Sequence, residues 1–330
     1  MSVFRVAMFS AKPYDEQSFE RHKPDNFKFE YFKTKLTENT SDLAYGFDAV
    51  CVFVNDDVNE EVLIKLSRVG IKYIVLRCAG FNNVDMSCAK RLGVKVARVP
   101  AYSPEAVAEH TIALMMTLNR KLHKAYNRTK EDNFSLDGLL GFNIHGKTVG
   151  LIGTGNIGLA TAKILAGFGA NIIATDPITN DRVVKLGVEY VSFEQLLAQS
   201  DIISLHCPLN ESTHHLLNSQ SIKQMKPGVM IINTGRGGLI DSQCLIDNLK
   251  NGHIGHLALD VYEQESELFF EDLSDSIVQD DIFQRLLTFP NVLITGHQGF
   301  FTREALDQIA TTTINNLDCL VHNRNCKNEV

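Results

Sequence analysis

The chain has 330 residues, a length that favours two domains, each large enough to bury its own core. Hydrophobic residues make up 44% and charged residues 22%, which excludes a disordered, collagen-like or coiled-coil chain. The formal net charge of −7 leaves no broad basic field, so neither nucleic acid nor an anionic membrane is an expected partner. Chemistry on a small molecule is the favoured class of function.

The cysteines and the apolar runs indicate the compartment. The seven cysteines are odd in number and form no CxxC pair, a pattern that fits neither a disulfide framework nor a zinc site. The N-terminal segment interrupts its short apolar run with an arginine, and no run of about 18 apolar residues occurs in the chain. We therefore expect reduced thiols, no membrane span and a cytoplasmic protein.

The first third of the chain has the rhythm of a parallel sheet. Short runs rich in β-branched and aromatic residues alternate with helical segments, which predicts right-handed βαβ units. The predicted strands are 4–10, 27–32, 49–55, 73–78 and 94–100. A long helix should follow, with Ser103 as its N-cap, Pro104 at its first position and an end near Arg128.

A second strand–helix series begins near residue 148 and predicts another doubly wound unit. Its predicted strands are 148–153, 171–176, 201–208, 229–235, 256–262 and 292–297. Between them, 263–281 holds eight carboxylates and no lysine or arginine. We interpret that segment as a solvated connection, because its spacing matches no EF-hand loop, although a cation site is conceivable. No metal site is predicted. A last helix, 302–322, should pack against the first domain.

A glycine pattern, GTGNIG, lies between the strand at 148–153 and a helical segment. It comprises Gly153, Gly155 and Gly158, with Asn156 and Ile157 between the last two. In a dinucleotide-binding turn the first glycine makes the tight turn, the second lets amides approach a pyrophosphate, and the third lets the helix pack on the strand. The helix N-terminus then faces the anion. A glycine turn without a ligand is the alternative.

An acidic residue follows the glycine pattern at the expected distance. Asp176 ends the next predicted strand, eighteen residues after Gly158. A carboxylate there accepts hydrogen bonds from the adenosine ribose and repels a 2′-phosphate, so we expect NAD rather than NADP. The alternative for Asp176 is a turn former before Pro177.

Several ordered blocks together resemble the family of D-isomer-specific 2-hydroxyacid dehydrogenases, and within it the fermentative D-lactate dehydrogenases. The blocks are RCAGFNNVD (77–85), VPAYSPEAVAEHT (99–111), GTGNIG (153–158), HCPLNESTHHLLN (206–218), KPGVMIINTGRGGLID (226–241), ALDVYEQE (258–265) and ITGHQGF (294–300). The resemblance implies an α/β fold with two doubly wound parallel-sheet domains. A Rossmann NAD domain, 102–298, would be inserted into a flavodoxin-like substrate domain formed by 1–101 and 299–330.

The resemblance also implies three catalytic residues, Arg236, Glu265 and His297. These residue types suit the reduction of a 2-oxo acid, because imidazole exchanges protons near neutral pH and a neighbouring carboxylate favours its protonated form. The planar guanidinium of Arg236 matches the substrate carboxylate and can polarise the carbonyl oxygen. Members of the family commonly have serine before the arginine; here Gly235 removes that hydroxyl.

Further contacts follow from the same resemblance. The expected cofactor contacts beyond the glycine turn are Cys207, Pro208, Thr213, Asn233, Thr234 and Asp260, with His206 added because it ends a strand beside the cofactor. The expected substrate contacts are Arg77, Ala79, Gly80, Tyr102 and Phe300, with backbone amides of the first turn holding a carboxylate. The other histidines considered are interpreted as solvated or core residues: His110, His123, His145, His214, His215, His253 and His256.

The activity implied is reversible reduction of pyruvate to D-lactate with NADH, carried out by a homodimer or homotetramer. Phe300 beside the substrate should exclude larger 2-oxo acids by steric overlap. Two alternatives stay open: a dehydrogenase for a bulkier D-2-hydroxy acid, and an NAD-sensing binding protein without turnover. Retention of Arg236, Glu265 and His297 argues against the second.

Overall fold

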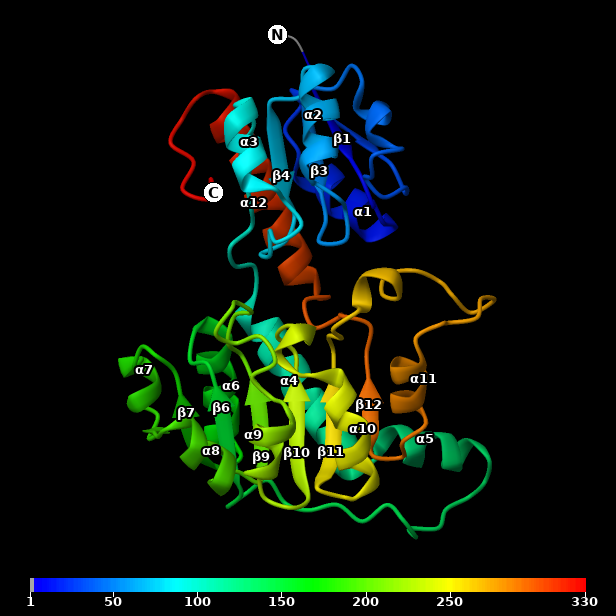
Figure 1. The fold of residues 1–330 in the computed structure, drawn as a ribbon, viewed down its shortest axis with the longest axis vertical. Helices are drawn as coiled ribbons and strands as arrows, with labels where there is room; N and C mark the ends of the chain where they lie inside the picture. The colour runs from blue at the N-terminus through cyan, green and yellow to red at the C-terminus, as the bar shows by residue number, and fades with distance from the viewer. Residues whose placement is uncertain (1–2) are drawn as a thin grey trace. The chain divides into compact units, whose positions relative to one another are not determined.

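The computed structural model describes residues 3–330, which form two compact units (Figure 1). The first unit contains the chain up to Ser103 together with Phe301–Val330, and the second contains Pro104–Phe300. The chain therefore leaves the first unit once and returns to it once. The sequence placed the two crossings at 101/102 and 298/299, two residues before each crossing in the structure.

The first unit is built on a five-stranded parallel sheet. Its strand order is β2-β1-β3-β4-β5, which is the flavodoxin-like doubly wound order expected from the sequence. The strands are β1 (Phe4–Met8), β2 (Phe27–Tyr31), β3 (Ala49–Val52), β4 (Tyr73–Leu76) and β5 (Lys95–Ala97). Each lies within a predicted run. The central strand β3 is buried along its whole length, as expected for a strand covered on both faces.

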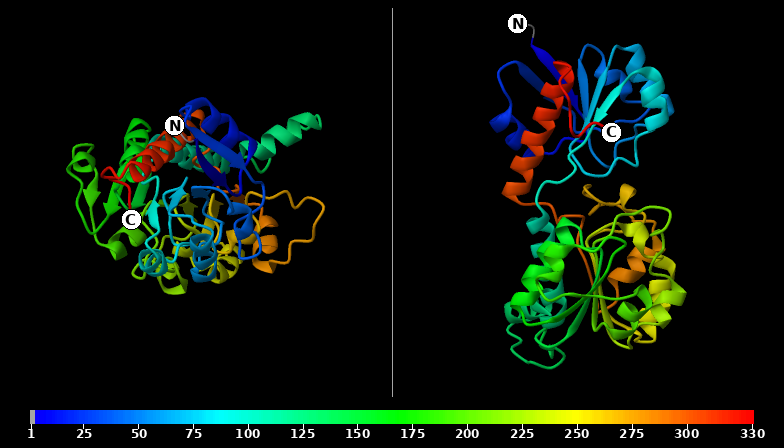
Figure 2. Two further views of the ribbon diagram at one scale, coloured as in Figure 1. Left: turned by 90° about the horizontal axis from the view of Figure 1, so that it is seen from above. Right: turned by 90° about the vertical axis from the view of Figure 1, so that its left-hand side faces the viewer.

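Helices cover both faces of this sheet (Figure 2, right). The helices are α1 (Pro13–His22), α2 (Glu60–Arg68), α3 (Met86–Leu92) and α12 (Arg303–Val321), with a short 3₁₀ helix at Ser41–Ala44. The C-terminal helix α12 packs beside α1 and buries Ala310, Ile314 and Leu317 against the sheet. Asn316 Nδ2 also donates to Arg98 O at 2.8 Å. The last helix therefore completes the first unit, as predicted.

The second unit contains a seven-stranded parallel sheet in the order β12-β11-β10-β9-β6-β7-β8. This is the Rossmann order. The strands are added outward from β6 through β7 to β8, and the chain then crosses to the other side of β6 and continues from β9 to β12, so the strand order reverses between β6 and β9. The strands are β6 (Thr148–Ile152), β7 (Asn171–Thr175), β8 (Glu189–Tyr190), β9 (Ile202–Leu205), β10 (Val229–Asn233), β11 (Ile254–Leu259) and β12 (Val292–Ile294). Six were predicted. Strand β8 was not predicted, because two residues are too few to show the alternation of apolar and polar side chains that marks a strand.

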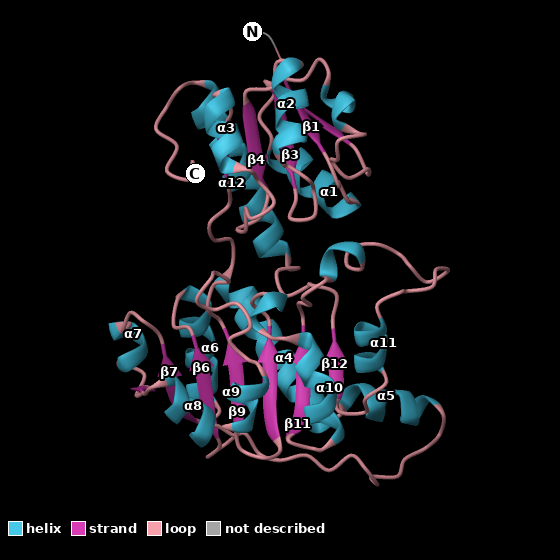
Figure 3. Cartoon of the chain, in the orientation of Figure 1, coloured by secondary structure: helices cyan, strands magenta, loops and turns pink. Residues whose placement is uncertain are grey.

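Helices cover both faces of the second sheet (Figure 3). Helices α4 and α6 contact each other and bury Leu114, Met115 and Leu165 on one face of the sheet. Helices α8, α9, α10 and α11 cover the other face. The helices are α4 (Pro104–Arg120), α5 (Leu122–Lys130), α6 (Asn156–Gly167), α7 (Asp181–Val184), α8 (Phe193–Gln199), α9 (Ser219–Lys223), α10 (Ser242–Lys250) and α11 (Asp281–Leu287), with 3₁₀ helices at Gly237–Leu239 and Glu265–Glu267. Within residues 3–330, no helix is both long and apolar enough to cross a bilayer.

The single long helix predicted from Ser103 to about Arg128 is wrong, because the structure breaks it at Lys121. This residue has a left-handed φ of +51°, and its Nζ donates to Gly138 O at 2.8 Å. Just before the break, the buried amide of Asn119 exchanges two hydrogen bonds with the backbone of Phe142. Helix α5 then buries no residue, so no core contact holds it in line with α4.

Candidate active site

The carboxyl ends of β6 and β9 meet where the strand order of the second sheet reverses, which is where open α/β sheets bind ligands. Gly153, directly after β6, has a φ of +98°, and a Cβ on it would lie 2.5 Å from the backbone nitrogen of Cys207. A Cβ on Gly158 would lie 2.2 Å from Gly153 O. Side chains at these two positions would therefore push apart the turn, helix α6 and the loop after β9.

Asp176 lies one residue beyond β7 and is held against the glycine turn. Its Oδ2 accepts hydrogen bonds from the backbone nitrogen and the hydroxyl of Thr154, at 2.7 and 3.1 Å. Its Oδ1 accepts from the nitrogen of Ile178 at 2.9 Å. The hydroxyl of Tyr190 in turn donates to Thr154 Oγ1 at 2.8 Å. Hydrogen bonds to both oxygens therefore fix the position of this half-buried carboxylate relative to the glycine turn.

The loop after β9 contains the next predicted cofactor contacts. His206 Nε2 lies 2.9 Å from Ser204 Oγ, and burial lowers the pKa of the imidazole to about 4, so the ring is neutral at physiological pH. Burial likewise raises the pKa of the Cys207 thiol to about 11. Thr213 Oγ1 donates to Pro208 O at 2.7 Å and closes this loop. His206 and Cys207 are therefore both uncharged where they would meet a ligand.

These features fit an NAD dinucleotide. Gly155 is the N-cap of α6, and a Cβ built on it would meet nothing within 4 Å, so the backbone there is open to close approach. The helix N-terminus suits a pyrophosphate, and the Asp176 carboxylate suits ribose hydroxyls. Beside the turn, His206 Nδ1 is buried without a hydrogen-bond partner among the described residues. A bound ligand could supply that partner.

Arg236 stands on a tight turn after β10. The fully buried Asn233 shapes the turn, since its Nδ2 donates to Arg236 O at 2.8 Å and its Oδ1 accepts from Gly235 N at 3.0 Å. The hydroxyl of Thr234 lies 2.8 Å from that of Thr111 on α4. The half-buried guanidinium of Arg236 donates through Nη1 to Gly235 O at 2.7 Å. Asn233 and Thr234 therefore position the arginine, whatever contacts they make with the cofactor.

Asp260, at the end of β11, holds the loop that carries His297. Its Oδ1 accepts from Thr295 Oγ1 at 2.5 Å and from Gln298 N at 2.9 Å, and its Oδ2 accepts from Gly299 N at 2.8 Å. His110 Nε2 lies 3.0 Å from Oδ1. Burial by itself raises the pKa of Asp260, but the hydrogen bonds from His110, Thr295 and the backbone outweigh it and lower the pKa to about 2.

His297 and Glu265 form a hydrogen-bonded pair. His297 Nδ1 lies 2.8 Å from Glu265 Oε1, and the other carboxylate oxygen accepts from Tyr262 N at 2.8 Å. The two side chains are 16% and 18% exposed, so both reach solvent while the contact is shielded. His297 has a left-handed φ of +53°, and its backbone nitrogen donates to Asp260 O at 2.7 Å. The strained backbone is therefore held by Asp260 from both sides.

Two phenylalanine rings lie against the imidazole. The ring centroid of Phe270 is 5.6 Å from that of His297, and the centroid of Phe300 is 6.4 Å away in an edge-to-face arrangement. Phe300 is 7% exposed. One wall beside the histidine is therefore apolar and bulky. The predicted residue Phe300 is part of it, and Phe270 was not predicted.

The first-unit candidates fall into two groups. Arg77 is engaged within the unit: its nitrogen donates to Val52 O, its Nη2 donates to Ser10 O at 2.7 Å, and its Nε pairs with Asp15 Oδ1 at 3.3 Å. The side chain is 2% exposed. By contrast Ala79, Gly80 and Tyr102 are half-buried, and Ala79 O accepts from Arg98 Nη1 at 2.7 Å. Arg77 thus anchors the end of β4, and the turn after it reaches the surface.

Several site residues escaped sequence reasoning. His110 and Thr295, 185 residues apart, meet at Asp260, and His110 had been interpreted as a solvated or core histidine. Thr154 occupies a position that the glycine pattern leaves unrestricted. Phe270 belongs to a connection interpreted as merely solvated. Among these residues, only His110 offered a signal in the sequence, because a histidine on the helix face that packs against the sheet can indicate a functional position.

Comparisons with known proteins agree with this geometry. The family described as "D-isomer specific 2-hydroxyacid dehydrogenase, NAD binding domain" matches residues 112–299. The chain belongs to this family of dehydrogenases, and NAD is its cofactor. The two α/β domains, the family and the cofactor expected from the sequence are thereby confirmed.

Individual relatives narrow the similarity. The chain is 54% identical over 327 residues to a "D-lactate dehydrogenase" of Escherichia coli, covering 99% of each chain. The solved apo-structure of D-lactate dehydrogenase from Escherichia coli matches with a TM-score of 0.91 at 52% identity, over 99% of this chain and 100% of that one. A solved structure of the pyruvate reductase of Chlamydomonas reinhardtii matches with a TM-score of 0.95 at 44% identity, over 99% of each chain.

Proposed function

We propose that this chain is an NAD-dependent D-lactate dehydrogenase, which reversibly reduces pyruvate to D-lactate. The observation that carries the proposal is the hydrogen-bonded pair of His297 and Glu265, 2.8 Å apart, in a dehydrogenase of this family. Its similarity to a D-lactate dehydrogenase and to a pyruvate reductase supports pyruvate as the substrate.

His297 is the proton donor in this proposal. Glu265 occupies Nδ1, so Nε2 is the ring nitrogen that can hold a proton toward the substrate. The hydrogen bond between Glu265 and Nδ1 fixes the plane of the ring. When bound, NADH supplies the hydride. His297 delivers its proton to the carbonyl oxygen of pyruvate as the C–O double bond becomes an alcohol, and it regains a proton from solvent.

Arg236 binds the substrate carboxylate. Its guanidinium offers a planar fork of donors that matches a carboxylate in two hydrogen bonds. The same positive charge stabilises the negative charge that develops on the carbonyl oxygen. In the structure one arm of the fork is turned to Gly235 O, so the side chain has an internal partner when no carboxylate is bound.

Cofactor binding is assigned to the glycine turn and the loops around it. Gly153, Gly155 and Gly158, with Asn156 and Ile157, hold the pyrophosphate at α6, and Asp176 holds the ribose. The remaining proposed cofactor contacts are His206, Cys207, Pro208, Thr213, Asn233, Thr234 and Asp260. The buried Nδ1 of His206, which has no hydrogen-bond partner within residues 3–330, supports a ligand at that loop.

The first unit is proposed as the substrate domain and the second as the NAD domain. Ala79, Gly80 and Tyr102 are the proposed substrate contacts of the first unit, and Phe300 limits substrate size in the second. Partial exposure of the turn after β4 supports this assignment. Arg77 anchors that turn, because its amide donates to Val52 O and its Nη2 donates to Ser10 O, while its buried Nη1 has no hydrogen-bond partner among the described residues.

Self-association and a cytoplasmic location complete the proposal. Large apolar side chains around α5 and the following loop are strongly exposed, which favours a homodimer or homotetramer. They are Leu122, Tyr126, Phe134, Leu136 and Leu140, from 54% to 88% exposed. All seven cysteines are free, which suits a reducing compartment. Light scattering of the purified protein would show a monomer if the oligomer is wrong.

The deciding experiment follows NADH oxidation with a panel of 2-oxo acids and identifies the product on a chiral column. The panel contains pyruvate, 2-oxoisocaproate, phenylpyruvate and phosphohydroxypyruvate. We expect the highest kcat/KM with pyruvate and D-lactate as the product. A higher value with a larger acid would show a dehydrogenase for bulkier substrates, and absence of turnover with tight NADH binding would show a sensor.

A further inference from the structure

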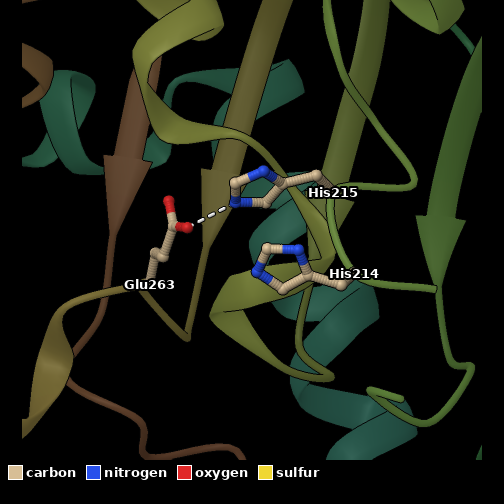
Figure 4. Close-up of side chains that lie close together, drawn as sticks. All are labelled: His214, His215 and Glu263. Carbon is tan, nitrogen blue, oxygen red and sulfur yellow. Dashed lines mark hydrogen bonds and ion pairs between the residues drawn. The ribbon is translucent and has the colours of Figure 1, made fainter. Parts of the chain in front are cut away.

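A second cluster of titratable side chains lies outside the catalytic set (Figure 4). It consists of His214 and His215, on the loop after β9, and Glu263, beyond the end of β11. Each offers one ligand atom, a ring nitrogen or a carboxylate oxygen, and these atoms lie within 4.8 Å of one another. Figure 4 shows both rings turning a nitrogen toward Glu263. Two imidazoles and a carboxylate therefore converge.

The backbone at His215 brings the two neighbouring rings to the same side. Consecutive side chains on an extended chain point in opposite directions. Here His215 has a left-handed φ of +50°, and the rings stack with centroids 3.9 Å apart. Such a conformation is strained and persists only where contacts hold it. Two do so: His215 N donates to Gly238 O at 2.8 Å, and Asn218 Nδ2 donates to His215 O at 2.9 Å.

Glu263 is held as firmly as the histidines. Its Oε1 lies 2.5 Å from His215 Nε2, and its Oε2 accepts from Ser242 N, at the start of α10, at 3.3 Å. A Cβ on Gly237 would lie 2.3 Å from Glu263 N, so the two backbones pack closely. Burial raises the pKa of Glu263, but the hydrogen bonds from His215 and Ser242 outweigh it and lower the pKa overall. Contacts on both oxygens therefore hold the carboxylate in place.

This donor set selects one class of ion. Imidazole nitrogens suit zinc, copper and nickel, whereas calcium and magnesium require oxygen ligands. Two histidines and a glutamate, with solvent in the remaining position, also form a recurrent zinc ligand set in proteins. We propose that His214, His215 and Glu263 bind one divalent transition-metal ion, such as Zn²⁺, with water completing the coordination.

The site needs only small movements to close. Metal–ligand distances of about 2.0–2.2 Å with tetrahedral angles place ligand atoms about 3.4 Å apart. His215 and Glu263 must separate by about 0.9 Å from their present 2.5 Å, and the other pairs, all within 4.8 Å, need to approach by no more than about 1.4 Å. His214 is exposed, so its ring can make the larger movement and the ion can reach the site from solvent. Ser242 N stays on the second oxygen of Glu263 and orients it.

The test titrates Co²⁺ and Zn²⁺ into untagged protein that has been stripped with a chelator and then freed of it. Calorimetry gives stoichiometry and affinity, and the absorption of Co²⁺ reports its ligands. We expect one ion per chain, visible Co²⁺ bands, and no charge-transfer band from a thiolate. We also expect metal to raise the midpoint of thermal unfolding.

His214→Ala is the decisive variant, because its exposed side chain can be removed without disturbing the fold. Affinity should fall at least about ten-fold, since loss of even an outer-shell partner typically costs about 10–100-fold. Glu263→Gln should weaken binding similarly. The matched control is His322→Ala, which removes an exposed histidine that also lies near a carboxylate, 3.1 Å from Asp318 Oδ1; its affinity should equal that of the unmodified chain.

Three results would overturn the proposal. They are the absence of stoichiometric binding by the unmodified protein, equal affinity of His214→Ala, and a thiolate charge-transfer band, which would place the ion on cysteine. None depends on the dehydrogenase activity, so the metal site stands or falls independently of the proposed reaction.

Discussion

Replacing Asp260 with asparagine tests whether its charge holds the His297 loop. The carboxylate accepts hydrogen bonds from Thr295, Gln298 and Gly299 and pairs with His110. An asparagine oxygen can replace only one of the two carboxylate oxygens. With that oxygen at the Oδ1 position, the amide NH₂ would face the N–H of Gly299, and two donors would then meet in a buried site.

The magnitude follows from the pKa of Asp260, which is lowered from 3.8 to about 2. At about 1.4 kcal/mol per pKa unit, the folded state favours the ionised form by about 2.5 kcal/mol, and asparagine resembles the protonated form. Because the folded pKa is the lower one, this stability is fully present above pH 3.8 and is lost as the pH falls through about 2. At pH 3 about 1.3 kcal/mol should remain.

The assay is urea unfolding of the unmodified protein and of Asp260→Asn at pH 7 and pH 3. We expect the variant to lose about 2.5 kcal/mol of unfolding free energy at pH 7 and about half as much at pH 3. The control is Asp247→Asn, an aspartate on α10 whose side chain is 87% exposed, which should change stability by no more than about 0.5 kcal/mol. A deficit for Asp260→Asn that is the same at both pH values would refute the charge argument.

Four further substitutions test the proposed chemistry. His297→Gln should lower kcat by about 10²–10⁴-fold while NADH affinity, measured by fluorescence, changes little; near-normal turnover would remove the histidine from proton transfer. Arg236→Lys should raise the KM for pyruvate strongly, because lysine keeps the charge but loses the bidentate fork; unchanged KM and kcat would show that the arginine lies outside the site. Asp176→Ala should narrow the preference for NADH over NADPH in steady-state kinetics, and an unaltered ratio would mean that another group discriminates. Phe300→Ala should raise kcat/KM for 2-oxoisocaproate relative to pyruvate, as space opens beside the histidine; an unchanged ratio would show that the ring does not limit substrate size.

The strand pattern and the glycine turn could be predicted because their causes are local. Runs of β-branched residues marked eleven of the twelve strands, and only the two-residue β8 was missed. The glycine pattern implied a tight turn, and the structure shows why: Gly153 has a positive φ and packs against the next loop. Boundaries were less predictable, as the break at Lys121 shows, because the Asn119–Phe142 contact that accompanies it joins residues 23 apart.

The roles of single side chains were harder to predict. Asp260 was expected beside the cofactor, and the structure adds that it holds the histidine loop. Arg77 was expected at the substrate, but its guanidinium is buried against Asp15 and Ser10. In both cases the residue type indicated a functional position. The hydrogen-bond partners of the side chain could not be predicted, since they come from distant parts of the chain.

The sequence by itself determined the order of the two α/β units, the glycine turn with its acidic residue, and the blocks that contain Arg236, Glu265 and His297. These depend on backbone conformation and on short spacings, which neighbouring residues control. Only the tertiary structure decided that His110 and Thr295 meet at Asp260, that Phe270 lies on the His297 ring, and that two histidines face Glu263. Such pairs form where loops from separate strands end at one edge of a sheet, and strand order and loop conformation set those distances.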